Sequence, residues 1–315
     1  MPRLSIVIPC LGGSAAFDGT LVSVLQNRPP KCEVIVAHTA AYDDPFDLAG
    51  EVHFVHCPDD PDESSLVGLI NTGIEAASSP IVHVLACGQE ATDGWTDAAL
   101  AHFRDDEVAA VVPAVMNADG SRLVSAGVRF TAAGNRAVLR NQRLLLAGSG
   151  HLRAAIGGPT LAAGFYRRDL LVALGGFNQA AGDQLADVDF ALNLRPLDLR
   201  TVFEPAARIV EVADPLAASG DSTFTRGRVA ERLFWRHAAD VGFPLALALH
   251  PLAVLSDPAA LLGRLVALLE VGSTARHRTR LVQAAARLAE IRDEERETLP
   301  LPAVPATKTT RRRAA

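Results

Sequence analysis

Cysteine is scarce in this chain, and the spacing of the few cysteines argues against two kinds of site. Only four occur among 315 residues, Cys10, Cys32, Cys57 and Cys87, and no two of them form a CxxC pair. This pattern is poor for a zinc site or a disulfide framework. We therefore expect buried free thiols, which behave as small apolar side chains.

An excess of basic residues and a long apolar run are also missing. The net charge of -6 provides no basic face for a phosphate backbone, so nucleic acid is not an expected partner. The most apolar stretch, VGFPLALALHPLAVL, is shorter than the ~18 to 20 residues of a membrane span and contains Pro244, His250 and Pro251. The chain opens directly into the β-type run LSIVIPC rather than a secretory signal. We expect a cytoplasmic protein.

The composition is that of a globular protein, with 49% hydrophobic and 21% charged residues. In the first half, apolar β-type runs alternate with helical patterns. The runs cover 4–10, 32–39, 52–57, 80–87 and 108–116, and the helical patterns cover 14–27, 64–78 and 95–104. Near-continuous apolar strands separated by helices predict an α/β fold with a mostly parallel sheet covered on both faces.

The pattern changes twice farther along the chain. Between 117 and 160 it loosens, and AGVRFTAAGNRAVLR predicts a hairpin with Gly134 in its turn. After 222 the spacing of apolar residues is helical, and the final PLPAVPATKTTRRRAA has little to pack. We expect one α/β domain over 1–221, a helical extension over 222–298 and a disordered basic tail over 299–315.

Several short motifs occur in the order found in family 2 glycosyltransferases. LSIVIPC resembles the first strand of that family, CEVIVAHT its second strand, and INTGIEAASSPIVHVL its asparagine-glycine helix with the following metal-bearing strand. GGFNQ and ADVDFALNLR resemble the later glycine-glycine-phenylalanine turn and acidic helix. The resemblance covers roughly residues 3 to 210. It implies the GT-A fold and transfer of a sugar from a nucleotide-sugar donor to an acceptor such as a glycan or a lipid-linked sugar.

The resemblance also implies a donor site at the ends of the first strands. Pro9 closes the first strand, His38 stands where an aspartate of the family contacts the nucleotide, and Asn71 is the helix asparagine. His38 is equally well interpreted as a strand-end histidine that faces solvent. The alternative for Asn71 is an amide bonded to local backbone, the usual role of a buried asparagine.

The metal-bearing strand departs most from the family. Where the resemblance implies two aspartates, this chain has Ala86 and Gly88, with Cys87 between them. A hard cation such as Mg²⁺ or Mn²⁺ needs several oxygen ligands. We therefore expect no divalent metal, and any activity would be metal-independent.

The acidic helix keeps part of its pattern. Asp187 stands where the resemblance implies the general base, and Asp189 is the second acid, but Ala186 replaces the usual glutamate. The alternative is that Asp187 is a first-turn acid that stabilises the helix dipole.

Basic residues could replace the cation at the donor phosphates. The segment FTRGRVAERLFWRHA carries Arg228, Arg232 and Arg236 at a spacing that shares one helical face, followed by His237. We therefore consider Arg236 and His237 as donor-binding residues. The alternative is a solvated stripe or one that faces anionic lipid.

Three functions remain open from the sequence. The first is a metal-independent glycosyltransferase. The second is a non-catalytic protein of the same fold that binds a glycan, a nucleotide or a partner. The third is an assembly factor at the inner face of a membrane, held there peripherally by its C-terminal helices and basic tail.

Overall fold

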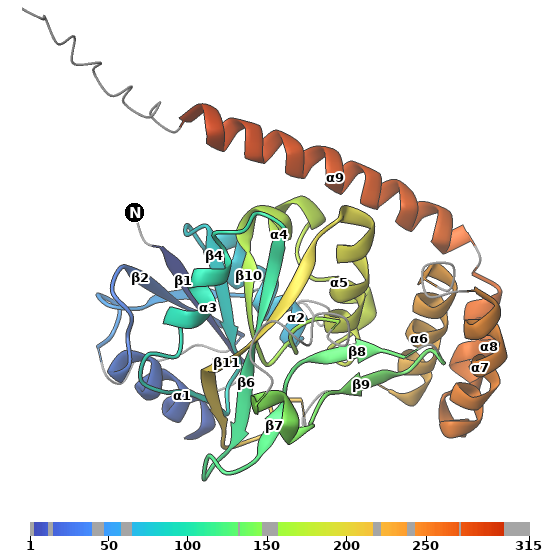
Figure 1. Ribbon diagram of the computed structural model, residues 1–315, viewed down its shortest axis with the longest axis horizontal. Coiled ribbons are helices and arrows are strands. Elements are labelled where there is room, and N and C mark those ends of the chain that lie inside the picture. Colours follow the sequence, from blue (N-terminus) through green and yellow to red (C-terminus); the bar gives the residue numbers. More distant parts are fainter. Residues whose placement is uncertain are drawn as a thin grey trace, which may run out of the picture.

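The apolar runs of the first half form one mixed sheet in the computed structural model (Figure 1). The structure describes residues 3–11, 15–39, 47–57, 65–131, 133–146, 157–216, 222–237, 243–270 and 272–298. The strands of this sheet are β1 (Leu4–Cys10), β2 (Cys32–His38), β3 (His53–His56), β4 (Ile81–Leu85), β5 (Gln89–Ala91), β6 (Val108–Asn117), β7 (Leu123–Ser125), β10 (Ala163–Arg167) and β11 (Arg200–Glu211).

The sheet is mixed: six of its nine strands run in one direction, and β5, β7 and β10 run in the other. The strands adjoin in the order β3-β2-β1-β4-β10-β6-β11-β5, and β7 pairs with β6. The first four strands in this order run parallel to one another, and β11 runs parallel to β6. Strand β10 runs antiparallel between β4 and β6, and β5 runs antiparallel to β11. The carboxyl ends of β1, β2 and β4 therefore lie side by side, and they form the edge where α/β folds bind ligands.

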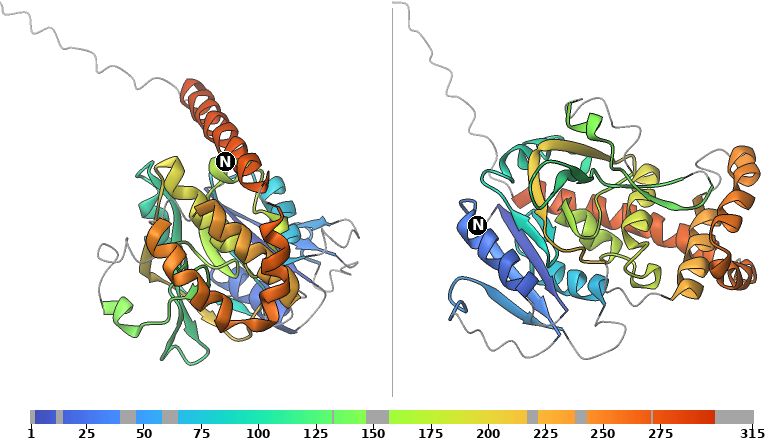
Figure 2. Two further views of the ribbon diagram at one scale, coloured as in Figure 1. Left: turned by 90° about the vertical axis from the view of Figure 1, so that its right-hand side faces the viewer. Right: turned by 90° about the horizontal axis from the view of Figure 1, so that it is seen from below.

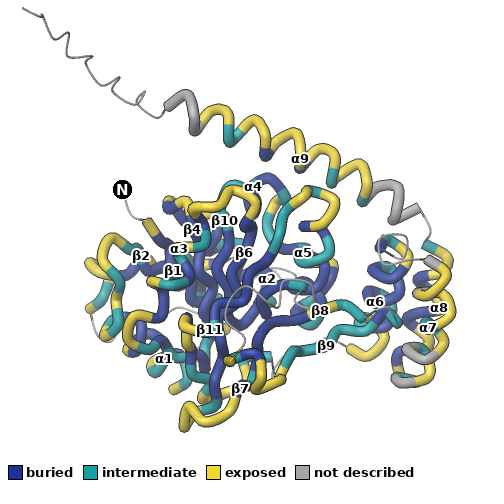
Figure 3. The backbone as a smooth tube through the Cα atoms, viewed as in Figure 1, coloured by how far each residue is buried: buried dark blue, intermediate teal, exposed yellow. Residues whose placement is uncertain are grey.

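Helices cover both faces of the sheet, as the near-continuous apolar strands predict. They are α1 (Ala15–Gln26), α2 (Leu66–Ala76), α3 (Asp97–His102), α4 (Arg168–Leu174) and α5 (Ala186–Leu194). Strand β1 sends Ile6 and Ile8 toward the cluster that holds α1 and α3, and Val7 toward the cluster that holds α2, α4 and α5. All seven β1 residues are consequently buried, and the central strands form the dark core in Figure 3.

One core residue is a histidine on β4. His83 is fully buried, stacks on Phe165 with ring centroids 3.8 Å apart, and places Nδ1 2.9 Å from the carbonyl oxygen of Gly164. Burial lowers the pKa of His83 to about 3, because the charged imidazolium would lose its hydration there. His83 is therefore neutral at physiological pH.

The loosely patterned segment forms a second, small sheet. Strands β8 (Val128–Phe130) and β9 (Arg136–Val138) pair antiparallel, and Gly134 lies in their turn with φ of +92°, as predicted from the sequence. A Cβ at Gly134 would lie 3.2 Å from the Phe234 ring, so the turn packs directly on the C-terminal helices. Figure 2 shows the hairpin running from the sheet to these helices.

The C-terminal part of the described chain is helical. It comprises α6 (Thr223–His237), α7 (Phe243–Ser256), α8 (Leu261–Leu268) and α9 (Gly272–Thr298). Helices α6 to α8 stand together at one end of the molecule, and α9 runs from that end back across α4 (Figures 1 and 2). Within the described ranges, no helix is long and apolar enough to cross a membrane.

A buried carboxylate connects the hairpin with three of these helices. Glu231 on α6 accepts hydrogen bonds from Trp235 at 2.8 Å, His250 on α7 at 3.0 Å and Arg264 on α8 at 3.1 Å. Arg264 also donates to Asn135 of the hairpin turn at 3.2 Å. Burial alone would raise the pKa of Glu231, but its hydrogen bonds outweigh burial and lower the pKa. The hairpin and the helical layer are thus joined through one ion-pair network.

Candidate functional site

The residues that replace the family's aspartates lie at the end of β4. Ala86 is fully buried and donates its backbone N–H to the carbonyl oxygen of Ala162 at 2.8 Å. Gly88 has φ of +92°, and a Cβ there would come within 2.5 Å of the carbonyl oxygen of Ala213. The chain after β11 therefore fills the space that an aspartate at position 88 would need.

These residues do not fit a divalent metal ion. Ala86 and Gly88 offer no side-chain oxygen, and the Cys87 thiol lies 3.1 Å from the carbonyl oxygen of Pro9. A hydrogen bond with Cys10 and burial raise the pKa of Cys87, so the thiol stays protonated. Across the described part of the chain, no three histidine, cysteine, aspartate or glutamate side chains are grouped to hold a metal.

The helix N-terminus beside this edge already holds a carboxylate. Asp183 is buried and accepts the backbone N–H of Leu66 at 3.2 Å and of Val67 at 3.0 Å, both in the first turn of α2. Ser65 caps the same helix by accepting the N–H of Gly68 at 3.0 Å. A helix N-terminus is a common phosphate site. Here its donors are committed within the protein.

Asp187 lies in the first turn of α5 and is closed off by an arginine from the hairpin. Its side chain is 0% exposed, and Arg136 reaches both carboxylate oxygens, with Nη2 2.7 Å from Oδ2 and Nε 3.1 Å from Oδ1. The backbone N–H of Val188 adds a bond at 2.8 Å. Burial raises the pKa of Asp187, and the Arg136 guanidinium opposes part of that rise. Arg136, not Asp187, forms the wall of the neighbouring cavity.

Asp189 and the basic residues of α6 meet on another side of α5. Asp189 accepts a hydrogen bond from Nδ2 of Asn178 at 3.0 Å, and its other carboxylate oxygen lies 3.4 Å from Nη1 of Arg236. The His237 ring is 5.6 Å from the ring of His277 on α9. Burial and the nearby Arg236 charge lower the pKa of His277 to about 4, so it adds no positive charge at neutral pH. Arg236 and His237 line the junction of α6 with α9 and do not line the larger cavity near Arg136.

The other predicted donor-site residues separate into two places. Pro9 and His38 lie at the adjoining ends of β1 and β2, and the His38 ring is 5.4 Å from the ring of His56. Asn71 instead faces the glycine turn after α4, where its amide accepts from Phe177 N at 2.7 Å and donates to Phe177 O at 2.9 Å. Asn71 thus bonds backbone, but this backbone is 106 residues away along the chain and is not the local backbone of the alternative interpretation.

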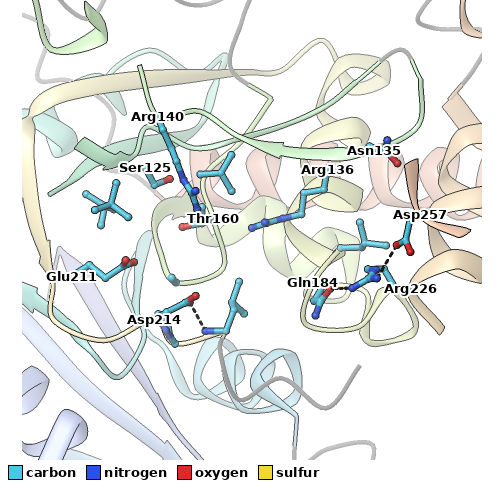
Figure 4. Close-up of a pocket in the computed structure, with 18 of the residues that line it drawn as sticks. Ser125, Asn135, Arg136, Arg140, Thr160, Gln184, Glu211, Asp214, Arg226 and Asp257 are labelled. Atoms are coloured by element: carbon cyan, nitrogen blue, oxygen red, sulfur yellow. Dashed lines mark hydrogen bonds and ion pairs between the residues drawn. The ribbon is translucent and has the colours of Figure 1, made fainter. Parts of the chain in front are cut away.

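A cavity of about 490 Å³ lies between the sheet, the hairpin and α6 (Figure 4). Its volume falls in the range of small-molecule sites. Its polar lining residues are Gln89, Ser125, Asn135, Arg136, Arg140, Thr160, Gln184, Glu211, Asp214, Arg226, Asp257 and Arg264. Figure 4 shows Arg140 directed from the hairpin side toward Ser125 and Thr160, with Glu211 on the opposite wall.

Positive charge on the cavity wall is largely neutralised. Arg226 pairs with Asp257 at 2.7 Å, and Arg136 and Arg264 pair with Asp187 and Glu231 as described above. Arg140 makes no direct ion pair within the described residues, but its charge interacts with Glu211 and opposes the rise in the pKa of that carboxyl. Burial raises the pKa of Glu211 across the cavity, while a hydrogen bond from Gln89 opposes the rise. The cavity can thus offer many hydrogen bonds but little net charge.

Comparison of the whole structure places this architecture among known folds. The crystal structure of GalNAc-T7 with UDP, GalNAc and Mn²⁺ matches with a TM-score of 0.54 and 16% sequence identity, over 73% of this chain. The fold is that of the GT-A glycosyltransferases. The match covers 48% of GalNAc-T7, so this chain spans about half the length of that protein. No family model matches the sequence, and no curated protein is similar to it.

The sequence did not point to the residues that define this GT-A cavity. Arg136 and Arg140 come from the loosely patterned segment. Glu211 is the last residue of β11 and Asp214 follows it, and neither belongs to a recognisable motif. Gln89 could have been noticed, because it directly follows the position of the missing aspartate. The hairpin joins the site through contacts between residues far apart in the sequence, such as the pairing of Arg136 with Asp187, 51 residues apart.

Proposed function

We propose that this GT-A protein is glycosyltransferase-like and binds a sugar unit in the cavity beside Arg136, without a divalent cation. The sugar would belong to a nucleotide-sugar donor or to an acceptor glycan. The observation that supports this most directly is the charge balance of the cavity, where Arg136, Arg226 and Arg264 form ion pairs and the charge of Arg140 is opposed by Glu211 across the cavity. A neutral polyol gains from many hydrogen bonds in such a site, whereas a diphosphate would require net positive charge.

Absence of the usual metal ligands supports the metal-independent part of the proposal. Ala86 and Gly88 supply no oxygen, and the Ala213 backbone lies where a side chain at 88 would point. For a nucleotide-sugar donor, the proposal retains Pro9 and His38 as contacts, since they lie at neighbouring strand ends. The side-chain amide of Asn71 bonds the backbone of Phe177, and the guanidinium of Arg236 pairs with Asp189. Neither side chain would contact the donor; each would hold neighbouring segments in position.

Sugar transfer would use Asp187 as the general base. A base must come within hydrogen-bond reach of the acceptor hydroxyl. Asp187 lies directly behind Arg136, so the guanidinium would have to move before the carboxylate could accept a proton. Asp189 is held by Asn178 and Arg236 and would position α5 rather than contact the substrate.

A second candidate function is binding without turnover, and the same ion pair favours it. Arg136 contacts both carboxylate oxygens of Asp187. If that pair persists with ligand bound, the cavity recognises a sugar but has no free base. The GT-A fold by itself does not establish activity.

Calorimetric titration tests the proposal and separates the two functions. We would titrate UDP-glucose, UDP-N-acetylglucosamine, GDP-mannose, dTDP-glucose and neutral oligosaccharides, each with EDTA and then with Mn²⁺. The expected result is binding that EDTA leaves unchanged. Arg140→Ala should weaken it by about tenfold, the size of one hydrogen bond to a charged group, whereas the exposed Arg143→Ala on the next segment should not.

Two results would count against the proposal: binding that appears only with Mn²⁺, and no binding of any sugar ligand. Turnover assays on the ligand that binds then decide between the functions. Hydrolysis or transfer that Asp187→Asn abolishes would establish the transferase, and tight binding with no turnover would establish the binding protein.

A further inference from the structure

Helices α7 and α8 expose an apolar surface at one end of the molecule. We call it the leucine face. Its members are Leu245, Leu247, Leu255, Leu261, Leu262, Leu265, Leu268 and Leu269. Leu269 is 86% exposed, Leu255 76% and Leu262 69%. In Figure 3 these helices are largely yellow, in contrast to the dark sheet. Exposed leucines concentrated on two consecutive helices in this way indicate an interaction site.

Helix α8 has its polarity reversed relative to an ordinary surface helix. Its one charged residue, Arg264, is 4% exposed and bonds Glu231 inside the protein. Gly263 packs against the backbone of α6, and Ala267 is buried. The leucines therefore face outward while the small and charged residues face inward. An ordinary surface helix has the opposite arrangement, so the outer face of α8 is suited to an apolar environment.

Helix α7 extends the same surface and is too short to cross a bilayer. Its sequence FPLALALHPLAVLS has no acidic residue, lysine or arginine, and His250 points inward to Glu231. A helix that is apolar all round is normally buried. Its 14 residues span about 21 Å, less than the ~30 Å of a hydrocarbon core. Helix α7 can lie in an interface but cannot span it.

Charge favours an anionic surface over a second copy of the chain. The first nine residues of α9, GSTARHRTR, have three arginines and no acidic residue, within a chain of net charge -6. Arg278 and Arg280 are exposed in the first part of α9, which begins next to α8 (Figure 1). Anionic lipid attracts such residues. A two-fold dimer through the leucine face would bring two like-charged α9 segments toward each other.

We propose that the leucine face docks on the surface of an anionic phospholipid bilayer. The leucines enter the boundary between headgroups and acyl chains, and the basic residues at the start of α9 contact the headgroups. This orientation leaves the sheet and the cavity on the water side. It does not depend on which ligand the cavity binds.

Vesicle co-sedimentation of the full chain tests the proposal. The vesicles would be pure phosphatidylcholine, and phosphatidylcholine with about one third phosphatidylglycerol. The test variant is Leu262→Asp with Leu269→Asp. Its matched control is Leu146→Asp, because Leu146 is 88% exposed but lies outside the leucine face. Both changes affect exposed side chains, and thermal unfolding would verify that each variant folds.

The proposal predicts that the wild type and the Leu146 variant sediment with anionic vesicles, more than with neutral ones. The bound fraction of the double leucine variant should be at least tenfold lower than that of the wild type. Arg278→Ser with Arg280→Ser should weaken binding to anionic vesicles and leave binding to neutral vesicles unchanged. Failure of the wild type to bind vesicles, or equal binding by the double variant, would overturn the proposal. A stable wild-type dimer in light scattering, absent in the Leu262→Asp, Leu269→Asp variant, would also overturn the proposal.

Discussion

Replacing Arg136 by methionine should destabilise the protein in a way that depends on pH. Methionine keeps apolar volume beside Asp187 but removes the guanidinium that contacts both carboxylate oxygens. Asp187 is 0% exposed, so water cannot replace the lost partner. Removing one partner of a buried ion pair costs about 3 to 5 kcal/mol, and we expect a loss of this size near neutral pH.

The pH dependence follows from the pKa of Asp187. Burial raises this pKa in the native wild type, and loss of Arg136 raises it further. An acid whose folded pKa is raised contributes stability below its unfolded pKa, and this contribution is lost as the pH rises through the folded pKa. The variant should therefore resemble the wild type at about pH 4 and fall behind it by about 1.4 kcal/mol per pH unit above the wild-type pKa.

Urea unfolding at about pH 4 and about pH 8 measures both quantities. Arg129→Met is the matched control, because Arg129 is exposed on the paired strand of the same hairpin. Asp187→Asn should cost less, about 1 to 3 kcal/mol, since Arg136 remains able to contact water in the cavity. An Arg136→Met effect that is equal at both pH values, or below about 1 kcal/mol, would refute the assignment of a buried pair.

Two other buried groups give predictions of opposite pH sign to the Arg136 variant. His83 has a folded pKa of about 3, so the native protein loses stability as the pH falls below about 6.5, by up to about 1.4 kcal/mol per pH unit. In His83→Leu, the free energy of unfolding should depend less on pH in this range. Glu231 has a lowered pKa, so its contribution exists above its unfolded value of 4.5 and is lost as pH falls through the folded pKa. Glu231→Gln should lower the free energy of unfolding by about 3 kcal/mol at neutral pH, and the difference from the wild type should be smaller below about pH 4. Calorimetric unfolding measures this, and a difference that does not change with pH would contradict the network with His250 and Arg264.

The sheet could be predicted from the sequence because helices bury both of its faces. Near-continuous apolar runs gave the positions of β1, β2, β4 and β6 to within a few residues. Strand β10 was not separable from the following helix, since GFYR runs directly into RDLLVAL without a turn. Its antiparallel place between β4 and β6 depends on pairing between distant strands, which local pattern does not contain.

The candidate site was only half visible in the sequence. Missing side-chain oxygens at Ala86 and Gly88 can be read from residue types alone. The occupied space beside Gly88 cannot, because Ala213 reaches it from 125 positions along the chain. Arg136 shows the same limitation, since nothing in a loosely patterned segment identifies the partner of a single arginine.

The polar groups near the strand ends are already bonded or covered within the protein. A buried polar group that is already bonded within the protein must give up that bond before it can bind a ligand, and losing the bond costs free energy. Here Asp183 occupies the N-terminus of α2, Arg136 closes Asp187, and the Ala213 backbone covers Gly88. Each contact stabilises the empty protein and would have to be broken by a diphosphate or a metal. Arg140 in the cavity has no ion pair of this kind to exchange, and for this reason we place the sugar unit in the cavity and leave only the nucleotide contacts of Pro9 and His38 at the strand ends.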